Sequence, residues 1–177
     1  MAPYPAPDFE KKICEPKLLA SRLKLLPRPL VFTNGCFDLL HRGHATYLAQ
    51  ARALGASLVV GVNSDASVKR LSKGAERPVN TLHERMVVLA ALESVNLITW
   101  FDADTPLELI CASKPDVLVK GGDWKAENIV GAREVSAWGG KVHSIPFLYQ
   151  TSTTAVLEKI RGSWPSAVKD KSPREKR

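Results

Sequence analysis

Near its beginning the chain passes from an apolar strand through a glycine turn into a helix. Residues 30–32 are apolar and β-prone, and Asn34-Gly35 is a dipeptide typical of turns. Between Gly43 and Gly55, which ends the helix, apolar residues recur at helical spacing. They are Tyr47, Leu48, Ala51 and Leu54. The pattern predicts a strand followed at once by a helix.

Two histidines, His41 and His44, lie where that helix begins. A helix start presents unpaired backbone N–H groups and the positive end of the helix dipole, so it attracts phosphate. Residues three apart share one helix face, so both imidazoles can face the same anion. The segment therefore predicts a polyphosphate site.

A zinc site is the main alternative for a His-x-x-His pair on a helix, but zinc needs further protein ligands. The other two histidines, His83 and His143, have no matching spacing. A lone histidine at a helix start is often only a cap or a surface residue. Two of them, directly after a strand and a glycine turn, argue against that interpretation, and we predict no metal ion held by protein ligands.

The composition indicates one globular domain. The chain has 177 residues, of which 45% are hydrophobic, enough to bury one core.

No apolar run approaches the roughly 20 residues of a membrane span, and residues 1–10 carry prolines and acids where a signal peptide is apolar. Cys14, Cys36 and Cys111 lack C-x-x-C spacing and are expected to be reduced thiols. We expect a cytoplasmic protein that binds no membrane.

The formal net charge of +7 is partly a property of the C-terminus. Residues 163–177 hold five basic residues against two acidic ones and are rich in Ser, Pro and Lys, so we expect a basic, disordered tail. Basic patches with interleaved aromatic residues, which single-strand binders use, are not evident. The remaining charge suits small polyanionic ligands, and we expect no nucleic-acid partner.

Strand and helix patterns alternate along the rest of the chain. Strands are predicted at residues 58–62, 95–101, 117–119 and 141–145, and helices at residues 64–71, 81–92, 105–113 and 128–138. A capping box, Thr81-x-x-Glu84, opens the second helix, and Pro106 is expected at the first position of the third. Short links between alternating elements imply an α/β fold with a doubly wound, parallel, five-stranded sheet and helices on both faces.

Polar motifs follow four of the five strands. Residues 35–44 follow the first strand, residues 63–65 the second, residues 120–123 the fourth and residues 150–154 the fifth. Each motif taken singly is explained as a helix cap or a turn. In parallel α/β sheets, however, ligands bind beyond the carboxyl ends of the strands. Four motifs at that edge together predict a binding site.

Residues 35–44, GCFDLLHRGH, resemble the G-x-F-D-x-x-H-x-G-H signature of the cytidylyltransferase-like nucleotidyltransferases, which have a Rossmann-like fold. Further segments resemble the branch of that family that makes ADP-heptose from ATP and D-glycero-β-D-manno-heptose 1-phosphate. They are residues 77–79, 84–86, 114–124 and 152–154. The resemblance covers about residues 29–162, leaves residues 1–28 as an N-terminal extension or helix, and implies a stand-alone enzyme without the sugar kinase to which some relatives are fused.

Two departures from the family pattern bear on the substrate. Trp124 stands where a tyrosine is common, and residues 148–150 (Leu-Tyr-Gln) stand where relatives that use CTP tend to carry Arg and Gly. The second departure argues against cytidylyl transfer to glycerol phosphate or ethanolamine phosphate. The product implied by the resemblance is a precursor of the lipopolysaccharide core.

The resemblance also implies roles for individual residues. The catalytic residues would be His41, His44 and Lys73, with Lys73 as the cation that stabilises the transition state. The nucleotide-binding residues would be Asn34, Gly35, Cys36, Phe37, Gly43, Lys120, Gly121, Asp123, Ser152 and Thr153. The substrate-binding residues would be Asp38, Asp65 and Arg77. For Lys73 and Arg77 the alternative is a solvated loop charge, and for Arg85 it is pairing within its helix.

The expected reaction is in-line attack of the sugar phosphate on the α-phosphorus of ATP, with pyrophosphate leaving. Such a reaction needs alignment of two polyanions and neutralisation of charge, with Mg²⁺ bridging the triphosphate and Asp38 as the one nearby carboxylate. Two alternatives stay open: another phosphorylated alcohol or phosphopantetheine as acceptor, and a non-catalytic nucleotide or nucleic-acid binder. We also expect a homo-oligomer, most simply a dimer, as in similar enzymes.

Overall fold

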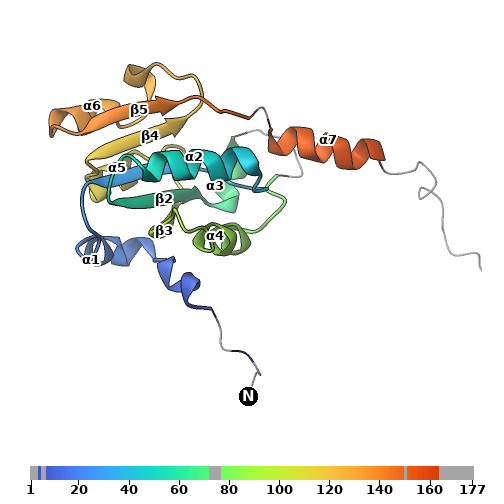
Figure 1. The fold of residues 1–177 in the computed structure, drawn as a ribbon, viewed down its shortest axis with the longest axis horizontal. Helices are drawn as coiled ribbons and strands as arrows, with labels where there is room; N and C mark the ends of the chain where they lie inside the picture. The colour runs from blue at the N-terminus through green and yellow to red at the C-terminus, as the bar shows by residue number, and fades with distance from the viewer. Residues whose placement is uncertain (1–3, 5–6, 72–76, 150, 164–177) are drawn as a thin grey trace, which may run out of the picture.

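The computed structural model of the protein describes residues 4, 7–71, 77–149 and 151–163. A five-stranded parallel sheet in the order β3-β2-β1-β4-β5 forms its centre (Figure 1). The strands are β1 (Leu30–Gly35), β2 (Ser57–Asn63), β3 (Leu97–Phe101), β4 (Val117–Gly121) and β5 (Lys141–Ile145). The winding direction reverses between β1 and β4, so these two neighbours form the topological switch point. The predicted α/β fold with a doubly wound parallel sheet is confirmed.

Helices precede, connect and follow the strands. The α-helices are α1 (Leu19–Leu23), α2 (Arg42–Arg52), α3 (Asp65–Arg70), α4 (Leu82–Ala90), α5 (Leu107–Ser113), α6 (Ala132–Ala137) and α7 (Thr153–Ser163). Three short 3-10 helices are η1 (Asp8–Lys12), η2 (Pro16–Leu18) and η3 (Ala126–Asn128). Helix α7 lies beyond the sheet, at the end where α2 begins (Figure 1).

Two apolar layers, one on each face of the sheet, form the core. Successive strand side chains point to opposite faces, so Val31 joins one layer while Leu30 and Phe32 join the other. The first layer contains buried side chains of α2 and α4, and the second contains those of α1, α5 and α6. Helices therefore cover both faces, as the sequence predicts. Because the strands are buried on both sides, they read as continuous apolar runs.

Most element boundaries differ from the predictions by one or two residues, and two helix starts differ in a way that the local sequence explains. The helix predicted at residues 128–138 is interrupted, because Gly131 has a φ of +85° and α6 begins only after it. Pro106 is the N-cap of α5 and precedes its first helical residue, Leu107. The capping box of Thr81 and Glu84 is confirmed at the start of α4.

The segment before β1 packs against an edge of the sheet. The Cys14 N–H donates to the Ile98 carbonyl at 2.8 Å, and Ile13 forms a parallel bridge with Ile98. Cys14 and Leu19 are both buried in the core. Ile13 and Cys14 thus cover part of the outer edge of β3, which would otherwise present unpaired backbone groups. The expected basic tail lies outside the described residues from residue 164 onward.

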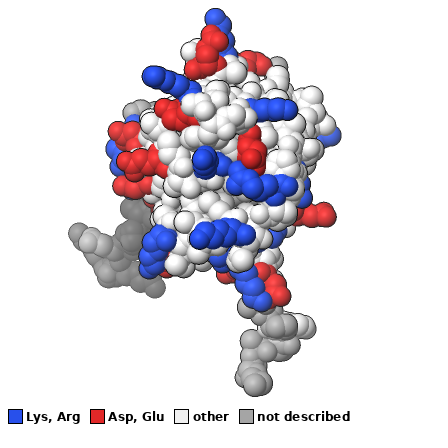
Figure 2. Space-filling view, turned by 90° about the vertical axis from the view of Figure 1, so that its left-hand side faces the viewer, with Lys and Arg blue, Asp and Glu red and all other residues white. Residues whose placement is uncertain are grey.

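Basic and acidic side chains are interspersed over the face shown in Figure 2. No helix among the described residues is long and apolar enough to cross a membrane.

Candidate functional site

A cavity of about 190 Å³ opens beyond the carboxyl ends of β1 and β4, at the switch point of the sheet. Predicted site residues from five separate segments line it. They are Asn34, Gly35, Cys36, Phe37, Asp38, His44, Arg77, Lys120, Gly121 and Thr153. The fold thus brings together the motifs that follow β1, β4 and β5, as the rule for parallel sheets predicts.

The two histidines of the motif stack on each other at the start of α2. His41 is the N-cap residue with extended backbone, and its carbonyl accepts hydrogen bonds from the N–H groups of His44 (3.0 Å) and Ala45 (3.2 Å). The ring centroids of His41 and His44 lie 3.9 Å apart with the planes at 21°. Burial lowers the pKa of His41, which favours the neutral form of this imidazole. An arriving phosphate would favour its protonated form.

The ring of His41 lies over Gly43. A Cβ atom added at Gly43 would lie 3.0 Å from both Cε1 and Nδ1 of His41. The Nδ1 atom of His41 is buried and has no hydrogen-bond partner within the part of the chain that the structure describes. A side chain at Gly43 would therefore press on the His41 ring, which would have to shift by a few tenths of an ångström.

Phe37 supports the second histidine. Its ring is buried and lies edge-on to His44, with 5.3 Å between the centroids. Its backbone has a φ of +47°, an uncommon conformation for a residue with a side chain. Gly35 makes room for it, since a Cβ there would lie 3.0 Å from the Phe37 ring. Phe37 thus orients His44, and its predicted contact with nucleotide stays a prediction.

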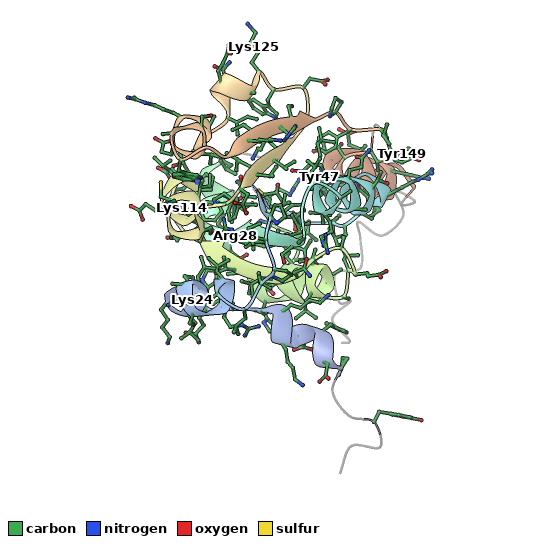
Figure 3. All side chains as sticks on the ribbon, turned by 60° about the vertical axis from the view of Figure 1, so that its left-hand side comes forward. Lys24, Arg28, Tyr47, Lys114, Lys125 and Tyr149 are labelled. Atoms are coloured by element: carbon green, nitrogen blue, oxygen red, sulfur yellow. The ribbon has the colours of Figure 1, made fainter. Side chains whose placement is uncertain are left out.

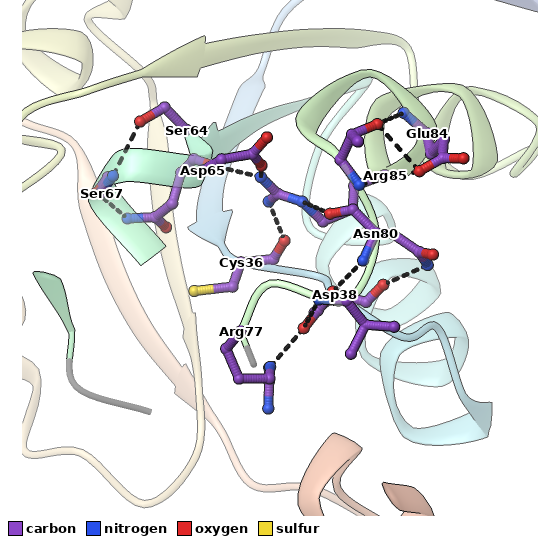
Figure 4. Close-up of polar contacts among 12 residues, drawn as sticks. Cys36, Asp38, Ser64, Asp65, Ser67, Arg77, Asn80, Glu84 and Arg85 are labelled. Carbon is purple, nitrogen blue, oxygen red and sulfur yellow. Dashed lines mark hydrogen bonds and ion pairs between the residues drawn. The ribbon is translucent and has the colours of Figure 1, made fainter. Parts of the chain in front are cut away.

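Asp38 anchors the segment that carries Arg77. Its carboxylate is fully buried, pairs with Nε of Arg77, and accepts hydrogen bonds from the backbone N–H groups of Val79 (2.8 Å) and Asn80 (3.0 Å) (Figure 4). Both carboxylate oxygens are engaged within the protein. Arg77 is itself buried and lines the cavity, so Asp38 holds a cation beside the motif.

Arg85 is hydrogen-bonded to three segments around the site. It is 1% exposed and donates to the carbonyls of Cys36 (2.6 Å), Asn63 (2.8 Å) and Asn80 (3.2 Å). It also pairs with Asp65 at 2.7 Å (Figure 4). The arginine therefore ties the ends of β1 and β2 to the start of α4, and its pairing reaches far beyond its own helix. Sequence reasoning missed this role, because helical periodicity does not distinguish a buried arginine from a buried apolar residue.

A second, larger cavity of about 480 Å³ adjoins the first. The two share Asn34, Gly35, Cys36, Lys120, Gly121 and Phe147. From there the larger cavity continues over an apolar wall that includes Trp124 and Val130 and past the polar groups of Asn63 and Asp104. The charged end near His44 and Arg77 suits phosphates, and the larger space suits the organic parts of ligands.

Comparisons with known proteins agree with this geometry. A family model described as cytidylyltransferase-like matches residues 32–162. The chain belongs to the cytidylyltransferase-like family. It is 52% identical over 155 residues to a D-beta-D-heptose 1-phosphate adenylyltransferase of Bordetella bronchiseptica, covering 86% of this chain and 96% of that protein.

Bifunctional relatives are longer than this chain. The bifunctional protein HldE of Hahella chejuensis is 57% identical over 132 residues, which are 75% of this chain and only 28% of that protein. The chain therefore corresponds to little more than a quarter of the bifunctional relatives it matches.

Two solved structures share the fold of this cytidylyltransferase-like chain. A lipopolysaccharide core biosynthesis protein from Thermoplasma volcanium superposes with a TM-score of 0.57 at 24% identity, covering 69% of this chain and 98% of that one. A pantoate-beta-alanine ligase from Francisella tularensis superposes with a TM-score of 0.56 at 15% identity, covering 84% of this chain and 76% of that one. At these identities the likeness concerns the fold alone.

Several predicted site residues, His41 and Gly43 among them, line neither cavity. Asp65 is bound to Arg85, and Ser152 accepts a hydrogen bond from the Ala155 N–H at 3.1 Å as the cap of α7. Asp123 lines neither cavity. Lys73 lies outside the described residues. Among the residues described, no group of three or more His, Cys, Asp or Glu side chains is placed to hold a metal ion.

Proposed function

We propose that this chain is an adenylyltransferase that transfers AMP from ATP to D-glycero-β-D-manno-heptose 1-phosphate, giving ADP-heptose and pyrophosphate. The observation that carries the proposal is the 52% identity, over 86% of this chain and 96% of the relative, with a D-beta-D-heptose 1-phosphate adenylyltransferase of Bordetella bronchiseptica. The intact motif at the switch point supports it, because His44 lines the cavity at the start of α2 and His41 stacks on it.

In this function the phosphate end of the site holds the triphosphate. His44, Arg77 and Lys120 line the smaller cavity, and the N-termini of α2 and α7 lie at its edge. An oxygen of the sugar phosphate attacks the α-phosphorus in line, and the bond to the pyrophosphate oxygen breaks. The positioned donors stabilise charge that moves onto the leaving group. No covalent nucleophile is needed.

His41 changes its protonation as the ligand binds. Its lowered pKa favours the neutral imidazole in the empty site, and an adjacent triphosphate favours the imidazolium form. We propose that His41 and His44 donate hydrogen bonds to the α- and β-phosphates. We also retain Lys73 as the proposed transition-state cation.

Magnesium belongs to the nucleotide in this proposal. The donor set fits that view, since the carboxylate of Asp38 already accepts hydrogen bonds from Arg77, Val79 and Asn80. Mg²⁺ is satisfied by phosphate oxygens and water, and it supplies charge neutralisation when bound. The protein's part is then to bind and orient the phosphates.

Three further features are proposed with the function. The enzyme would act in the cytoplasm, its product would serve lipopolysaccharide core synthesis, and the chain would form a homo-oligomer. The use of the product and the homo-oligomer follow from likeness to the family, and none of the three is needed for the chemistry of the site.

The test is an acceptor panel with product identification. Mg²⁺-ATP is incubated with heptose 1-phosphate, glycerol 3-phosphate or 4′-phosphopantetheine, and the nucleotide product is identified by mass. ADP-heptose as the dominant product supports the proposal. Efficient adenylyl transfer to another acceptor, with none to heptose 1-phosphate, would refute the acceptor and keep the reaction type.

A further inference from the structure

Arg42, the variable residue of the H-x-G-H element, lies against Tyr149. Its guanidinium carbon is 3.6 Å from the centroid of the Tyr149 ring, and its Nη2 donates to the Tyr149 hydroxyl at 2.6 Å. Figure 3 shows Tyr149 at the edge of the molecule. Neither residue lines either cavity of the site.

The contact joins the two helix starts that flank the phosphate end of the site. Arg42 directly follows His41 and is the first residue of α2. Tyr149 precedes Thr153, which is buried, lines the smaller cavity and begins α7. The carbonyl of Tyr149 accepts a hydrogen bond from the Thr151 N–H at 2.9 Å. This bond links Tyr149 to the residues that lead into α7.

The backbone near Tyr149 also packs closely on α2. A Cβ atom added at Gly43 would lie 3.5 Å from the Tyr149 carbonyl oxygen. Upstream, the ring of Phe147 lies on Gly121 and stands edge-on to Tyr47 with 5.9 Å between centroids. Phe147 therefore attaches the segment to β4, and Arg42 attaches it to the histidine helix.

We infer that the Arg42–Tyr149 pair is a positioning contact that fixes the start of α7 against the start of α2, so that both helix N-termini address one triphosphate. The inference rests on the proposed nucleotide-binding function. Helix N-termini attract phosphate only when their N–H groups point at it. A segment held in place before binding loses less conformational freedom when the ligand arrives.

The side chains involved determine what a variant should change. Arg42 is exposed and Tyr149 is half-buried, so the pair adds little to the stability of the fold. A charge-assisted hydrogen bond together with a cation–π contact can still hold a local segment. Removing either partner should therefore weaken ATP binding without unfolding the protein.

The experiment measures the Kd of Mg²⁺-ATP by calorimetry for the full chain and for Arg42→Ala, Tyr149→Ala and the double variant. We expect the Kd to rise about three- to tenfold in each single variant. The Kd of the double variant should be no higher than that of the single variant that binds ATP less tightly. Tyr149→Phe keeps the ring face and loses the hydroxyl, so its Kd should lie between those of the wild type and Tyr149→Ala. Arg133→Ala, an exposed arginine on α6, is the matched control and should bind like the wild type.

Two results would overturn the inference. One is an unchanged Kd in Arg42→Ala. The other is a loss in Arg42→Ala that is more than about tenfold larger than in Tyr149→Ala, since Arg42 would then act on the phosphates by itself. Melting temperatures within about 2 °C of the wild type exclude unfolding as the cause.

The measurement separates this inference from the acceptor proposal, because ATP binding needs no acceptor. If the variants behave as expected but heptose 1-phosphate is not adenylylated, the acceptor proposal fails and the positioning contact stands. If heptose 1-phosphate is adenylylated while Arg42→Ala keeps its ATP affinity, the positioning contact fails.

Discussion

The imidazole of His41 lies stacked on that of His44, 3.9 Å between centroids, at the first turn of α2. Two imidazolium ions at this separation would repel each other, so the empty site favours at least one neutral ring. Burial keeps the pKa of His41 below its ordinary value, in the same direction. The stacked pair is therefore best suited to carry positive charge when a polyanion lies against it.

The first prediction concerns pH and stability. Because the pKa of His41 is lower in the folded chain than the roughly 6.5 of the unfolded one, the unfolded chain binds protons more readily below about pH 7. The titration of His41 therefore lowers the stability of the fold as the pH drops through about 6.5. Above about pH 7.5 His41 is neutral in both states, so its effect on stability vanishes. Melting temperatures at pH 5 to 8 should show a shallower acid slope in His41→Gln than in the wild type. An identical slope in both would contradict the lowered pKa.

The second prediction concerns Gly43. Gly43→Ala places a Cβ 3.0 Å from the His41 ring, so the ring must move, although alanine favours the helix itself. We expect kcat to fall about tenfold or more with little change in melting temperature, because a displaced ring no longer aligns with the phosphates. Gly162→Ala on α7, where nothing lies within 4 Å of the new Cβ, is the control. Full activity in Gly43→Ala would show that the ring position is unimportant.

The third prediction concerns Arg85. Replacing this buried arginine by methionine leaves three carbonyls and Asp65 without their donor, and should cost about 3 kcal/mol or more of unfolding free energy. Arg70→Ala, an exposed arginine paired with Asp102 and Asp104, should cost about 1 kcal/mol or less. Denaturant unfolding measures both. Equal small losses would mean that Arg85 does not hold the three segments together.

The fourth prediction separates two roles of Asp38. Asp38→Asn weakens the anchors to Arg77, Val79 and Asn80, so melting temperature and ATP affinity should both fall. The Mg²⁺ concentration for half-maximal activity, measured at saturating ATP, should stay within about twofold, because the ion is carried by the nucleotide. A tenfold higher Mg²⁺ requirement at unchanged stability would instead make Asp38 a metal ligand.

The sequence predicted the fold and the meeting of the polar motifs at one edge of the sheet, because both depend on patterns of short range. Alternating apolar runs determine the order of strands and helices, and motifs placed after parallel strands must meet at one edge. The pairing of His41 with His44 follows in the same way from their spacing at a helix start. A break such as the one at Gly131 was missed, because glycine inside a helical pattern does not reveal its φ.

Long-range side-chain partners could not be predicted. Asp38 and Arg77 are separated by 39 positions, and Arg85 and Cys36 by 49, so only the folded chain shows that they bond. The sequence assigned Asp38 and Asp65 to substrate, and the structure engages both within the protein. No role for Arg42 could be predicted, because Arg42 occupies the variable position of the motif and its partner Tyr149 lies far along the chain.

The most direct test of the central claim measures pyrophosphate release with Mg²⁺-ATP and heptose 1-phosphate, for the wild type and for the double variant His41→Ala, His44→Ala. We expect release that depends on the heptose phosphate, is much weaker with CTP, and falls roughly a hundredfold or more in the variant, whose fold is checked by its melting temperature. Release that persists in the folded variant, or that is absent from the wild type, would contradict adenylyl transfer at the stacked histidines.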